Sequence, residues 1–580
     1  MREGAKLKYT KAEMEAKIAE LGYGAYYSDK IPFAYSYVAE NSVENNANTH
    51  GSHVTGIVAA NGDEENGGIK GVAPDAQIFA LKVFASDGLG SSVDNIIRAV
   101  EDAVKLGADI INLSLGSTPG FYDDVEYLQK ALATAEEHGV LACVAAGNDG
   151  LASSDKNANN NTNDWGVIDT GAVSSPSVYP GALSVASVDN AFYSTTGLDI
   201  FSGEEQIYSG AATDFSVGNR TDWTSIGEVQ LVDCGYGDLM TDIMPLFGNT
   251  PEGPFVALVQ RGKDIAFGTK IMNASMLGAK AVIVYNNEAT DEVVSNVLAE
   301  NAQFYAAVLV SGNTGAKLKE LAASGATISF RGLYDAIVPN TTSAGDVSAF
   351  SSWGTTPTLD IKPEISAPGG SIRSLSKGTD YEVISGTSMA TPYVAGSAAL
   401  VLEALQDALA DGSLSLGGQS LNGFLKNTLM NTADPILDGS SIFSVRQQGS
   451  GMVDPMEAAS NRVIATHDGI ASIALKEVGQ TTSFTVTLTN YGTEAETYTL
   501  PASSQVYTDY TDPDSADYYV VPLNGASVSY GASSVTVPAG GTASVTCTLN
   551  IPASAAQNHY VEAYVSFDGD IDLSLPLLGF

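Results

Sequence analysis

Apolar and polar residues follow two different spacings along the first 190 or so residues. The strings "IFALKVFA" (78–85), "ADIINLSLG" (108–116) and "VLACVAAGNDG" (140–150) are short apolar runs typical of buried strands. Between them, "SVDNIIRAVEDAVKLG" (92–107) and "DDVEYLQKALATAEEHG" (123–139) repeat apolar residues at helical spacing. This alternation predicts a parallel sheet with crossover helices. In such sheets, functional sites gather beyond the carboxyl ends of the strands, where "SLG" and "AAGN" fall.

A helix is predicted near the start of the chain. Thr10 and Glu13 have the spacing of a capping box, and Gly22 is placed to end the helix. Ser92 is expected to cap the later helix over 92–107. The apolar stripe of the first helix consists of Met14, Ile18 and Leu21.

Changes in pattern divide the chain into four segments. Residues 1–189 and 346–461 share the α/β pattern and are predicted to be two parts of one domain. Residues 190–345 contain scattered strands, turns and one βαβ-like piece, which indicates an inserted domain. Residues 462–580 alternate apolar and polar positions between turns, as β-sandwich strands do, and the last strand looks cut short.

The net charge of the chain excludes some classes of binding partner. Lysine and arginine number 27 against 67 aspartates and glutamates, which gives a net charge of −40 along a chain of 580 residues. Such a field repels nucleic acid and anionic membranes, so neither is expected as a partner. The acidity suits a soluble protein and is compatible with bound calcium.

Neither the cysteines nor the N-terminal sequence identifies the cellular compartment of the protein. Cys143, Cys234 and Cys547 lie far apart, so neither a disulfide framework nor a zinc site is expected. The first 24 residues are charged and helical rather than signal-like, and no apolar run of membrane-spanning length is expected. Either the protein is cytoplasmic, or the chain lacks its true ends.

The string "SGTSMATP" (385–392) carries the first candidate for chemistry. Ser388 stands among small residues directly before an apolar helix. A serine there is close to backbone N–H groups and to the positive end of the helix dipole, both useful for an oxyanion. The alternative for such a serine is a simple helix cap.

A histidine and an asparagine are the next candidates. His50 precedes the small and branched residues of "VTGIVAA", and it is one of only five histidines. Asn148 ends the strand "VLACVAAGN" and can aim a side-chain amide at an oxyanion. Taken alone, His50 can be a structural histidine and Asn148 an ordinary turn residue.

Four motifs follow one another along the chain: "HGSHVTGIVAA" (50–60), "INLSLG" (111–116), "AAGN" (145–148) and "GTSMATPYVAG" (386–396). In this order they resemble the motifs of the subtilases, the subtilisin-like serine peptidases. The resemblance runs over the α/β parts of residues 30–435, and it implies a subtilisin-like parallel sheet with crossover helices. The insertion resembles a protease-associated domain, and the last segment a fibronectin type III-like β-sandwich. This layout is similar to the cell-envelope proteinases of Gram-positive bacteria, of the lactocepin and complement-peptidase type.

The resemblance implies a role for each matched residue. His50 would be the general base, Ser388 the nucleophile and Asn148 an oxyanion donor alongside the Ser388 backbone N–H. His53 matches a second, structural histidine. Two edges would bind an extended peptide by strand addition. One edge consists of Ser114, Leu115 and Gly116, and the other of Gly88, Leu89 and Gly90.

Partners and cofactors follow from the same resemblance. Protein or peptide substrates are expected, the protein is expected to be monomeric, and its location to be secreted or attached to a Gram-positive envelope. No cofactor is required for the chemistry. The loop "NGDEENGG" (61–68) sits where many subtilases place structural calcium, although a solvated surface loop explains it too.

One family feature is missing. Subtilases carry the triad aspartate at the end of an apolar strand, tens of residues before the histidine. The only aspartate before His50 is Asp29, which lacks both the apolar run and the following glycine. Truncation upstream of Met1 would explain the loss, and loss of the aspartate in a serine triad costs about four orders of magnitude in kcat. Weak or absent peptidase activity is therefore expected for this chain as written.

Three hypotheses stand at this point. The first is a serine endopeptidase seen as a fragment, and the second is an inactive subtilase-like protein that binds peptides or surface partners. The third is another hydrolase on the same serine, such as an esterase, which the peptide-binding edges argue against.

Overall fold

The computed structural model divides the chain into two compact units. The first unit joins Met1–Ala191 to Thr341–Phe580, and the second is Phe192–Asn340. The described residues are 5–38, 43, 49–85, 92–117, 120–121, 126–151, 170–215, 222–263, 265–290, 305–378, 380–512 and 518–580.

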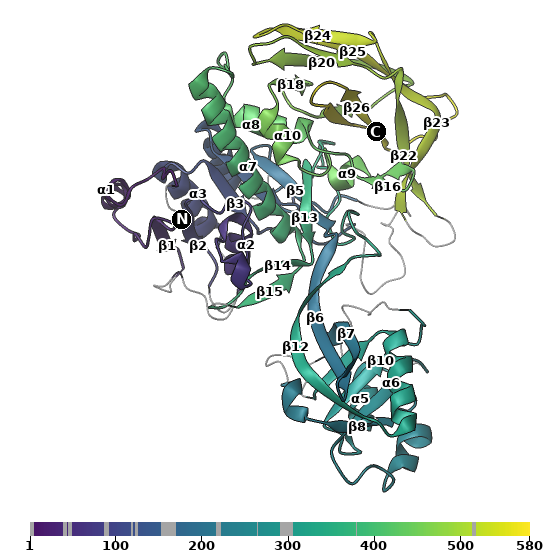
Figure 1. The fold of residues 1–580 in the computed structure, drawn as a ribbon. Helices are drawn as coiled ribbons and strands as arrows, with labels where there is room; N and C mark the ends of the chain where they lie inside the picture. Colours follow the sequence, from purple (N-terminus) through teal and green to yellow (C-terminus); the bar gives the residue numbers. More distant parts are fainter. Residues whose placement is uncertain are drawn as a thin grey trace. The chain divides into compact units, whose positions relative to one another are not determined.

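A four-stranded parallel sheet forms the centre of the first unit (Figure 1). Its order is β13-β5-β4-β3, and all three pairings are parallel, which confirms the predicted parallel sheet with crossover helices. β13 follows the second unit in the sequence, yet it pairs with β5, which precedes that unit. The strands are β3 (Ile110–Leu113), β4 (Leu141–Ala145), β5 (Ala182–Asp189) and β13 (Ile365–Gly370).

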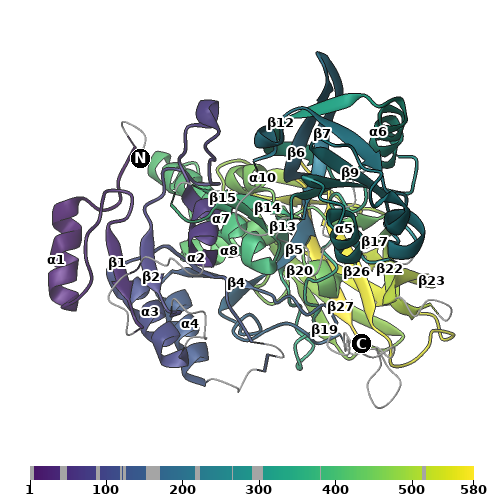
Figure 2. The same ribbon diagram turned by 90° about the horizontal axis from the view of Figure 1, so that it is seen from below.

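Helices cover both faces of this sheet (Figures 1 and 2). In β4, Cys143 packs against α7 and α8, whereas its neighbour Val144 packs in the cluster that contains α3 and α4. Successive side chains of an interior parallel strand point to opposite faces, so both must be apolar. The helices of this unit's α/β part are α2 (His50–Ala59), α3 (Val93–Leu106), α4 (Glu126–Glu137), α7 (Thr387–Asp411), α8 (Leu421–Asn431), α9 (Val445–Gln448) and α10 (Pro455–Ser460). Its remaining strands are the hairpin β14 (Ile372–Leu375) and β15 (Tyr381–Ile384), with β16 (Leu437–Asp438) and β17 (Ser441–Ile442).

The first helix, α1 (Lys11–Leu21), has the predicted ends. The Glu13 carboxylate accepts a hydrogen bond from the Thr10 N–H at 2.8 Å, and the Thr10 hydroxyl accepts one from the Glu13 N–H at 3.4 Å. Gly22 closes the helix with a φ of 84°. Ser92 caps α3 through the Asn95 N–H, again as predicted.

A separate two-stranded parallel sheet pairs β1 (Phe33–Ser36) with β2 (Phe79–Lys82). The chain leaves β2, passes through α3 and returns in β3. The two strands of such a βαβ unit normally belong to one sheet. Among the strands that the structure describes, however, β2 pairs only with β1, and β3 only with β4. No described strand therefore joins β2 to β3.

The second unit is a closed barrel of order β10-β11-β7-β6-β12-β8-β9. β9, α5 and β10 form a parallel βαβ piece, as the sequence predicts. Leu198, Val256 and Ile283 are fully buried in its core. Its elements are β6 (Phe192–Ser202), β7 (Glu205–Asp214), β8 (Val229–Asp233), β9 (Phe255–Gln260), α5 (Phe267–Ser275), β10 (Ala281–Tyr285), β11 (Ala307–Val310), α6 (Gly312–Ser324) and β12 (Thr327–Pro339).

Only strands follow α10 in the described part of the chain, in agreement with the loss of helical pattern near residue 462. Eight of them form a sheet of order β18-β20-β25-β23-β22-β26-β27-β19, and β21 pairs with β24. Val486, Val528 and Leu575 are fully buried in their shared core. The strands are β18 (Val463–Thr466), β19 (Ile473–Lys476), β20 (Thr481–Asn490), β21 (Glu496–Thr499), β22 (Ser503–Thr511), β23 (Tyr518–Tyr530), β24 (Ser534–Val537), β25 (Thr542–Asn550), β26 (Val561–Phe567) and β27 (Leu573–Gly579).

One described helix is longer and more apolar than was expected from the sequence. Among the described helices, α7 is long and apolar enough to cross a membrane, judged by length and composition alone. Most of its apolar stretch is buried inside the protein, where it packs against the parallel sheet. A helix that is covered on most sides has to be apolar on most sides, which explains its composition.

Candidate active site

The candidate nucleophile, Ser388, is the second residue of α7. Its hydroxyl donates to the Ser114 carbonyl at 3.4 Å, and the Ser114 hydroxyl donates to the Ser388 carbonyl at 2.8 Å. In a regular helix, the N–H of residue 392 would donate to the Ser388 carbonyl, but Pro392 has no N–H. The Ser114 hydroxyl takes that place. Because Ser114 directly follows β3, this pair of bonds ties the start of α7 to the sheet.

Asn148 follows β4 and is held by α7. Its side-chain oxygen accepts hydrogen bonds from the Thr387 N–H at 2.9 Å and from the Thr387 hydroxyl at 3.0 Å. With the oxygen engaged in this way, the amide nitrogen is the end of the side chain that remains to donate.

The first turn of α7 supplies a second donor. The Thr387 N–H is used by Asn148, and the two N–H groups that follow Ser388 donate to the Gly386 carbonyl. The Ser388 N–H takes part in none of these bonds and stands at the positive end of the helix dipole. A side-chain amide and a backbone N–H of this kind are the donors that an oxyanion hole uses.

His50 is the first residue of α2 and is half-buried. Burial lowers the pKa of His50, and the neighbouring His53 lowers it further, whereas the Glu382 carboxylate raises it by less. A lowered pKa keeps the imidazole neutral near pH 7, as a general base must be.

His53 is fully buried and joins α2 to the β14-β15 hairpin. Its Nε2 lies 3.0 Å from the Ile372 carbonyl oxygen and 3.2 Å from that of Glu382. The Ser374 hydroxyl donates to the His53 carbonyl at 2.7 Å. These contacts fit the structural part that the resemblance implies for His53.

A single cavity of about 1860 Å³ brings most of the predicted site residues together. They come from α2, from the ends of β3 and β4, and from the first turn of α7, which are far apart in the sequence. The predicted residues that line the cavity are His50, Ser114, Leu115, Gly116, Asn148 and Ser388.

The same cavity extends between β2 and β3. Phe79 and Leu81 of β2 line one side, and Ile111 and Leu113 of β3 line the other. Helices close it above and below the plane of the strands, as they would close over an interior strand of a parallel sheet. The helix residues that line it include Ile96 and Val100 of α3, Val58 of α2, and Ala395 and Leu402 of α7. We call this part of the cavity the β2–β3 slot.

The second predicted peptide-binding edge and Asp29, which the sequence does not favour as the triad aspartate, are not among the described residues that line this cavity. Gly88, Leu89 and Gly90 lie outside the described residues. Asp29 is exposed, accepts a hydrogen bond from the Tyr26 hydroxyl at 2.5 Å, and is not among the described residues that line the cavity.

The acidic loop 61–68 is closed by its own hydrogen bonds. The Gly68 N–H donates to the Asp63 carbonyl at 2.7 Å, and the Asp63 carboxylate accepts from the Glu65 N–H at 3.2 Å. Within the described ranges, no three His, Cys, Asp or Glu side chains gather in a way that could hold a metal ion. Structural calcium at this loop stays a prediction.

The three cysteines, Cys143, Cys234 and Cys547, are free and buried. Burial raises the pKa of each thiol to about 12, so the thiolate that would react or bind a metal is scarce near neutral pH.

Two residues with a part in this geometry were not singled out from the sequence. Thr387 orients Asn148, and Pro392 frees the Ser388 carbonyl for Ser114. The sequence does contain a signal for the part that Pro392 plays. A proline four residues after the serine, inside a predicted helix, means that the serine carbonyl needs another donor.

Comparisons with known proteins identify the family. A model described as the subtilase family matches residues 22–455, and one described as an Fn3-like domain matches residues 473–578. The chain therefore belongs to the subtilase family and carries an Fn3-like domain.

Relatives resemble the chain over almost its whole length. A PII-type proteinase of Lactococcus lactis subsp. cremoris is 33% identical over 602 residues, covering 99% of this chain and 31% of the relative. A C5a peptidase of Streptococcus pyogenes serotype M6 is 28% identical over 604 residues, covering 98% of this chain and 47% of the relative. These matches confirm the resemblance to proteinases of this type. The chain spans less than half of the length of either relative.

A solved structure is also similar. It is the psychrophilic subtilisin-like protease Apa1 from Pseudoalteromonas sp. AS-11, which is 22% identical and has a TM-score of 0.39. The match covers 72% of this chain and 84% of that one.

Proposed function

We propose that this chain is the catalytic part of a serine endopeptidase, with Ser388 as nucleophile, His50 as general base, and Asn148 and the Ser388 N–H as oxyanion donors. The observation that carries the proposal is the cavity lined by all three side chains. Membership of the subtilase family and the proteinase names of the relatives support it.

Each step of the reaction has a group to perform it. The Ser388 oxygen bonds to the scissile carbonyl carbon while its proton passes to His50. The carbonyl oxygen becomes an oxyanion that accepts hydrogen bonds from Asn148 and from the Ser388 N–H. His50 then gives its proton to the leaving amine, the C–N bond breaks, and an ester on Ser388 remains. Water hydrolyses the ester by the same steps and restores the hydroxyl.

The substrate class is a polypeptide in extended conformation. Ser114, Leu115 and Gly116 continue β3 along the cavity, next to the nucleophile, where a substrate strand can add to an edge. In this proposal, Gly88, Leu89 and Gly90 form the opposite edge.

The third member of the triad is proposed to reach His50 from the β2–β3 slot. A strand that lies in the slot parallel to β3 ends at the same side as Ser114, because carboxyl ends of parallel strands share one edge of the sheet. The slot is lined by apolar side chains on both faces, which suits an apolar strand ending in a carboxylate.

The rest of the proposal concerns the whole protein. The barrel unit Phe192–Asn340 is proposed to be a protease-associated domain, and the acidic loop 61–68 to hold structural calcium. The protein is proposed to act as a monomer on protein substrates, in a secreted or envelope-attached form. Relatives from Lactococcus, Lacticaseibacillus and Streptococcus support a Gram-positive origin.

Fluorophosphonate labelling of Ser388 tests the function. The chain is compared with a version extended at its N-terminus by an apolar strand that ends in aspartate, taken from a lactococcal relative. Ser388→Ala serves as the blank. Strong labelling of the extended protein and weak labelling of the chain alone are expected.

The other outcomes separate the remaining hypotheses. No labelling of either protein would contradict the enzyme and favour an inactive subtilase-like binding protein. Labelling together with cleavage of ester substrates but not of proteins would favour an esterase.

A further inference from the structure

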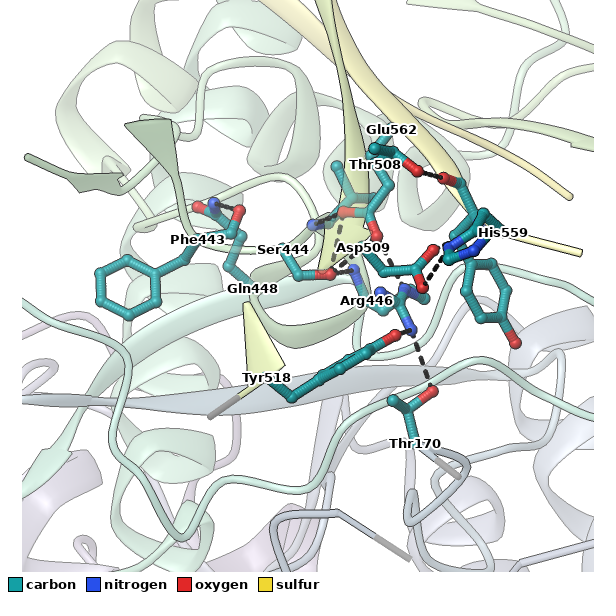
Figure 3. A network of polar contacts seen from close by, with 12 residues as sticks. Thr170, Phe443, Ser444, Arg446, Gln448, Thr508, Asp509, Tyr518, His559 and Glu562 are labelled. Carbon is teal, nitrogen blue, oxygen red and sulfur yellow. Dashed lines mark hydrogen bonds and ion pairs between the residues drawn. The ribbon is translucent and has the colours of Figure 1, made fainter. Parts of the chain in front are cut away.

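A buried ion pair joins the Fn3-like domain to the α/β part of the first unit (Figure 3). Glu562 of β26 and Arg446 of α9 are both fully buried, and the Arg446 Nε donates to the Glu562 carboxylate at 2.7 Å. The same carboxylate accepts hydrogen bonds from the Ser444 hydroxyl at 2.8 and 2.9 Å and from the Val445 N–H at 2.6 Å. One carboxylate of the Fn3-like domain thus holds three consecutive residues of the α/β part.

Arg446 is fixed in place from several further sides. Its Nη1 donates to the Tyr518 hydroxyl at 3.0 Å and to the Thr170 hydroxyl at 3.1 Å. The guanidinium also lies over the Tyr560 ring, 3.9 Å from its centre. A guanidinium held by a carboxylate, two hydroxyls and a ring face has little freedom to move.

Arg446 in turn fixes the segment 350–354. Its backbone carbonyl accepts a hydrogen bond from the Gly354 N–H at 2.7 Å. The Trp353 ring lies beside Tyr518, tilted by 54° with 5.5 Å between the ring centres, and the Arg446 guanidinium lies 5.6 Å from the Trp353 ring centre.

The segment 350–354 is bonded directly to the loop that carries Asn148. The Trp353 N–H donates to the Gly150 carbonyl at 2.9 Å, and the Ser352 N–H donates to the Gly147 carbonyl at 3.0 Å. Bonds also run the other way along this ladder, from the Gly150 N–H to the Phe350 carbonyl and from the Asp149 N–H to the Ser352 hydroxyl.

Gly147 packs closely against the segment 350–354. Its φ is +119°, and a Cβ at this position would lie 2.6 Å from the Ser352 hydroxyl oxygen. The loop and the segment are therefore in close contact, so a shift of one displaces the other.

We propose that Glu562 and Arg446 are positioning residues for the oxyanion hole: the Fn3-like domain holds Arg446, Arg446 holds the segment 350–354, and that segment sets the position of the Asn148 amide. This inference rests on the proposed part of Asn148 in catalysis. It makes the Fn3-like domain a determinant of turnover as well as of stability.

The test uses two variants of the full chain, extended as above so that activity is measurable. Glu562→Gln keeps the size of the side chain and removes its charge, and Tyr518→Phe removes a single hydrogen bond to Arg446. The second variant covers the case in which the first does not fold, because an unpaired buried charge is strongly destabilising. Asn431→Ala is the matched control, since Asn431 also bonds across to this domain, at the Ser574 carbonyl, but contacts neither Arg446 nor the segment 350–354 through any described hydrogen bond.

Two readouts distinguish positioning from stability. Glu562→Gln is expected to lower kcat by about 10- to 100-fold with little change in KM, the scale of a misplaced catalytic group, and Tyr518→Phe by less. In an Asn148→Ala background, the same changes are expected to have an effect of less than about twofold, because coupled residues are not additive. Hydrogen exchange is expected to speed up at residues 147–150 in both variants and to stay unchanged there in Asn431→Ala.

Opposite results would overturn the inference. They are an unchanged kcat in a folded variant, equal effects with and without Asn148, or unchanged exchange at residues 147–150. Exchange does not depend on activity, so it still tests the coupling if Ser388 proves unreactive. In that case the proposed function fails, and hydrogen exchange alone decides whether Glu562 and Arg446 are coupled to residues 147–150.

Discussion

At the residue scale, hydrogen bonds between neighbouring side chains determine which atoms of the candidate site are engaged and which are left to donate. Thr387 engages the Asn148 oxygen, so the amide nitrogen is left to donate. Pro392 cannot donate to the Ser388 carbonyl, so the Ser114 hydroxyl does, and Ser388 is tied to the end of β3. In the proposed function, these contacts hold the two oxyanion donors in place before the substrate binds, which is how an oxyanion hole lowers a barrier.

Replacement of Asn148 tests this arrangement. Asn148→Ala is expected to lower kcat by about 10²- to 10³-fold and to leave KM nearly unchanged, because the lost hydrogen bond forms mainly in the transition state. Steady-state kinetics with a peptide substrate measure the change in the extended protein. Asn148→Asp is the matched control of similar size, and it should be at least as poor because a carboxylate cannot donate. If KM rose by as large a factor as kcat fell, the result would contradict the role of Asn148 as an oxyanion donor.

The pH dependence follows from the environment of His50. Burial and His53 hold its folded-state pKa below the ordinary value of about 6.5, so the imidazole stays neutral to lower pH than usual. The unfolded chain then binds the proton more readily than the folded one. The stability of the fold should therefore fall as pH drops below about 6.5, until the lower folded pKa is passed.

For this chain alone, the acid limb of Ser388 labelling should lie below pH 6.5 or so. An NMR titration of His50 gives the same midpoint directly, with His50→Gln to assign the signal. A midpoint above the ordinary value would show that a neighbouring carboxylate outweighs burial.

At the element scale, the β2–β3 slot is the feature that separates this chain from an ordinary parallel sheet. Both flanking strands are four residues long, and each pairs on one side with a described strand. The slot between them has the apolar cover on both faces that an interior strand requires. Its carboxyl end meets the candidate active site.

The slot can be filled in a test with a synthetic peptide. An apolar peptide of about six Val and Ile residues ending in aspartate, with a lysine tail for solubility, is expected to bind parallel to β3. It should raise the pKa of His50, and it should raise the rate of Ser388 labelling by up to about 10⁴-fold if its aspartate acts as the third member of the proposed triad. The same peptide with asparagine in place of aspartate should bind without raising the rate. A peptide with proline at its centre should not bind, because proline cannot pair within a sheet. Equal rates with all three peptides would refute the slot as the source of the carboxylate.

At the scale of the whole molecule, the Fn3-like domain belongs to the fold of the α/β part rather than forming a separate appendage. Val445 and Ile442 pack with Val520, Tyr564 and Leu578 in one apolar cluster. Together with the buried ion pair, this cluster makes the two parts a single compact unit.

Removal of the Fn3-like domain should therefore destabilise what remains. A chain of residues 1–461 exposes Ile361, Ile442 and Val445, and each apolar side chain that loses its cover costs about 1.5–3 kcal/mol at full exposure. A lower midpoint of thermal unfolding is expected, with a stronger tendency to aggregate. Deletion of the barrel unit, with residues 191 and 341 joined by a short linker, is the comparison. An unchanged midpoint for residues 1–461 would show that the interface adds nothing to stability.

The sequence by itself determined the features that depend on near neighbours. Thr10 and Glu13 predict the start of α1, apolar spacing predicts the strands and helices of the sheet, and the motifs around His50, Asn148 and Ser388 indicate the family. In each case the physical cause lies within one element: a cap bonds three residues away, and a buried strand must be apolar on both faces.

Only the tertiary structure decided which distant groups meet. Thr387 and Asn148 are 239 positions apart, Ser114 and Ser388 are 274 apart, and Arg446 and Glu562 are 116 apart. The order of the described strands, and with it the β2–β3 slot, is likewise absent from local patterns. The reason is physical: a residue's own neighbours set its backbone preference, whereas its partners across the fold depend on how whole helices and strands pack together.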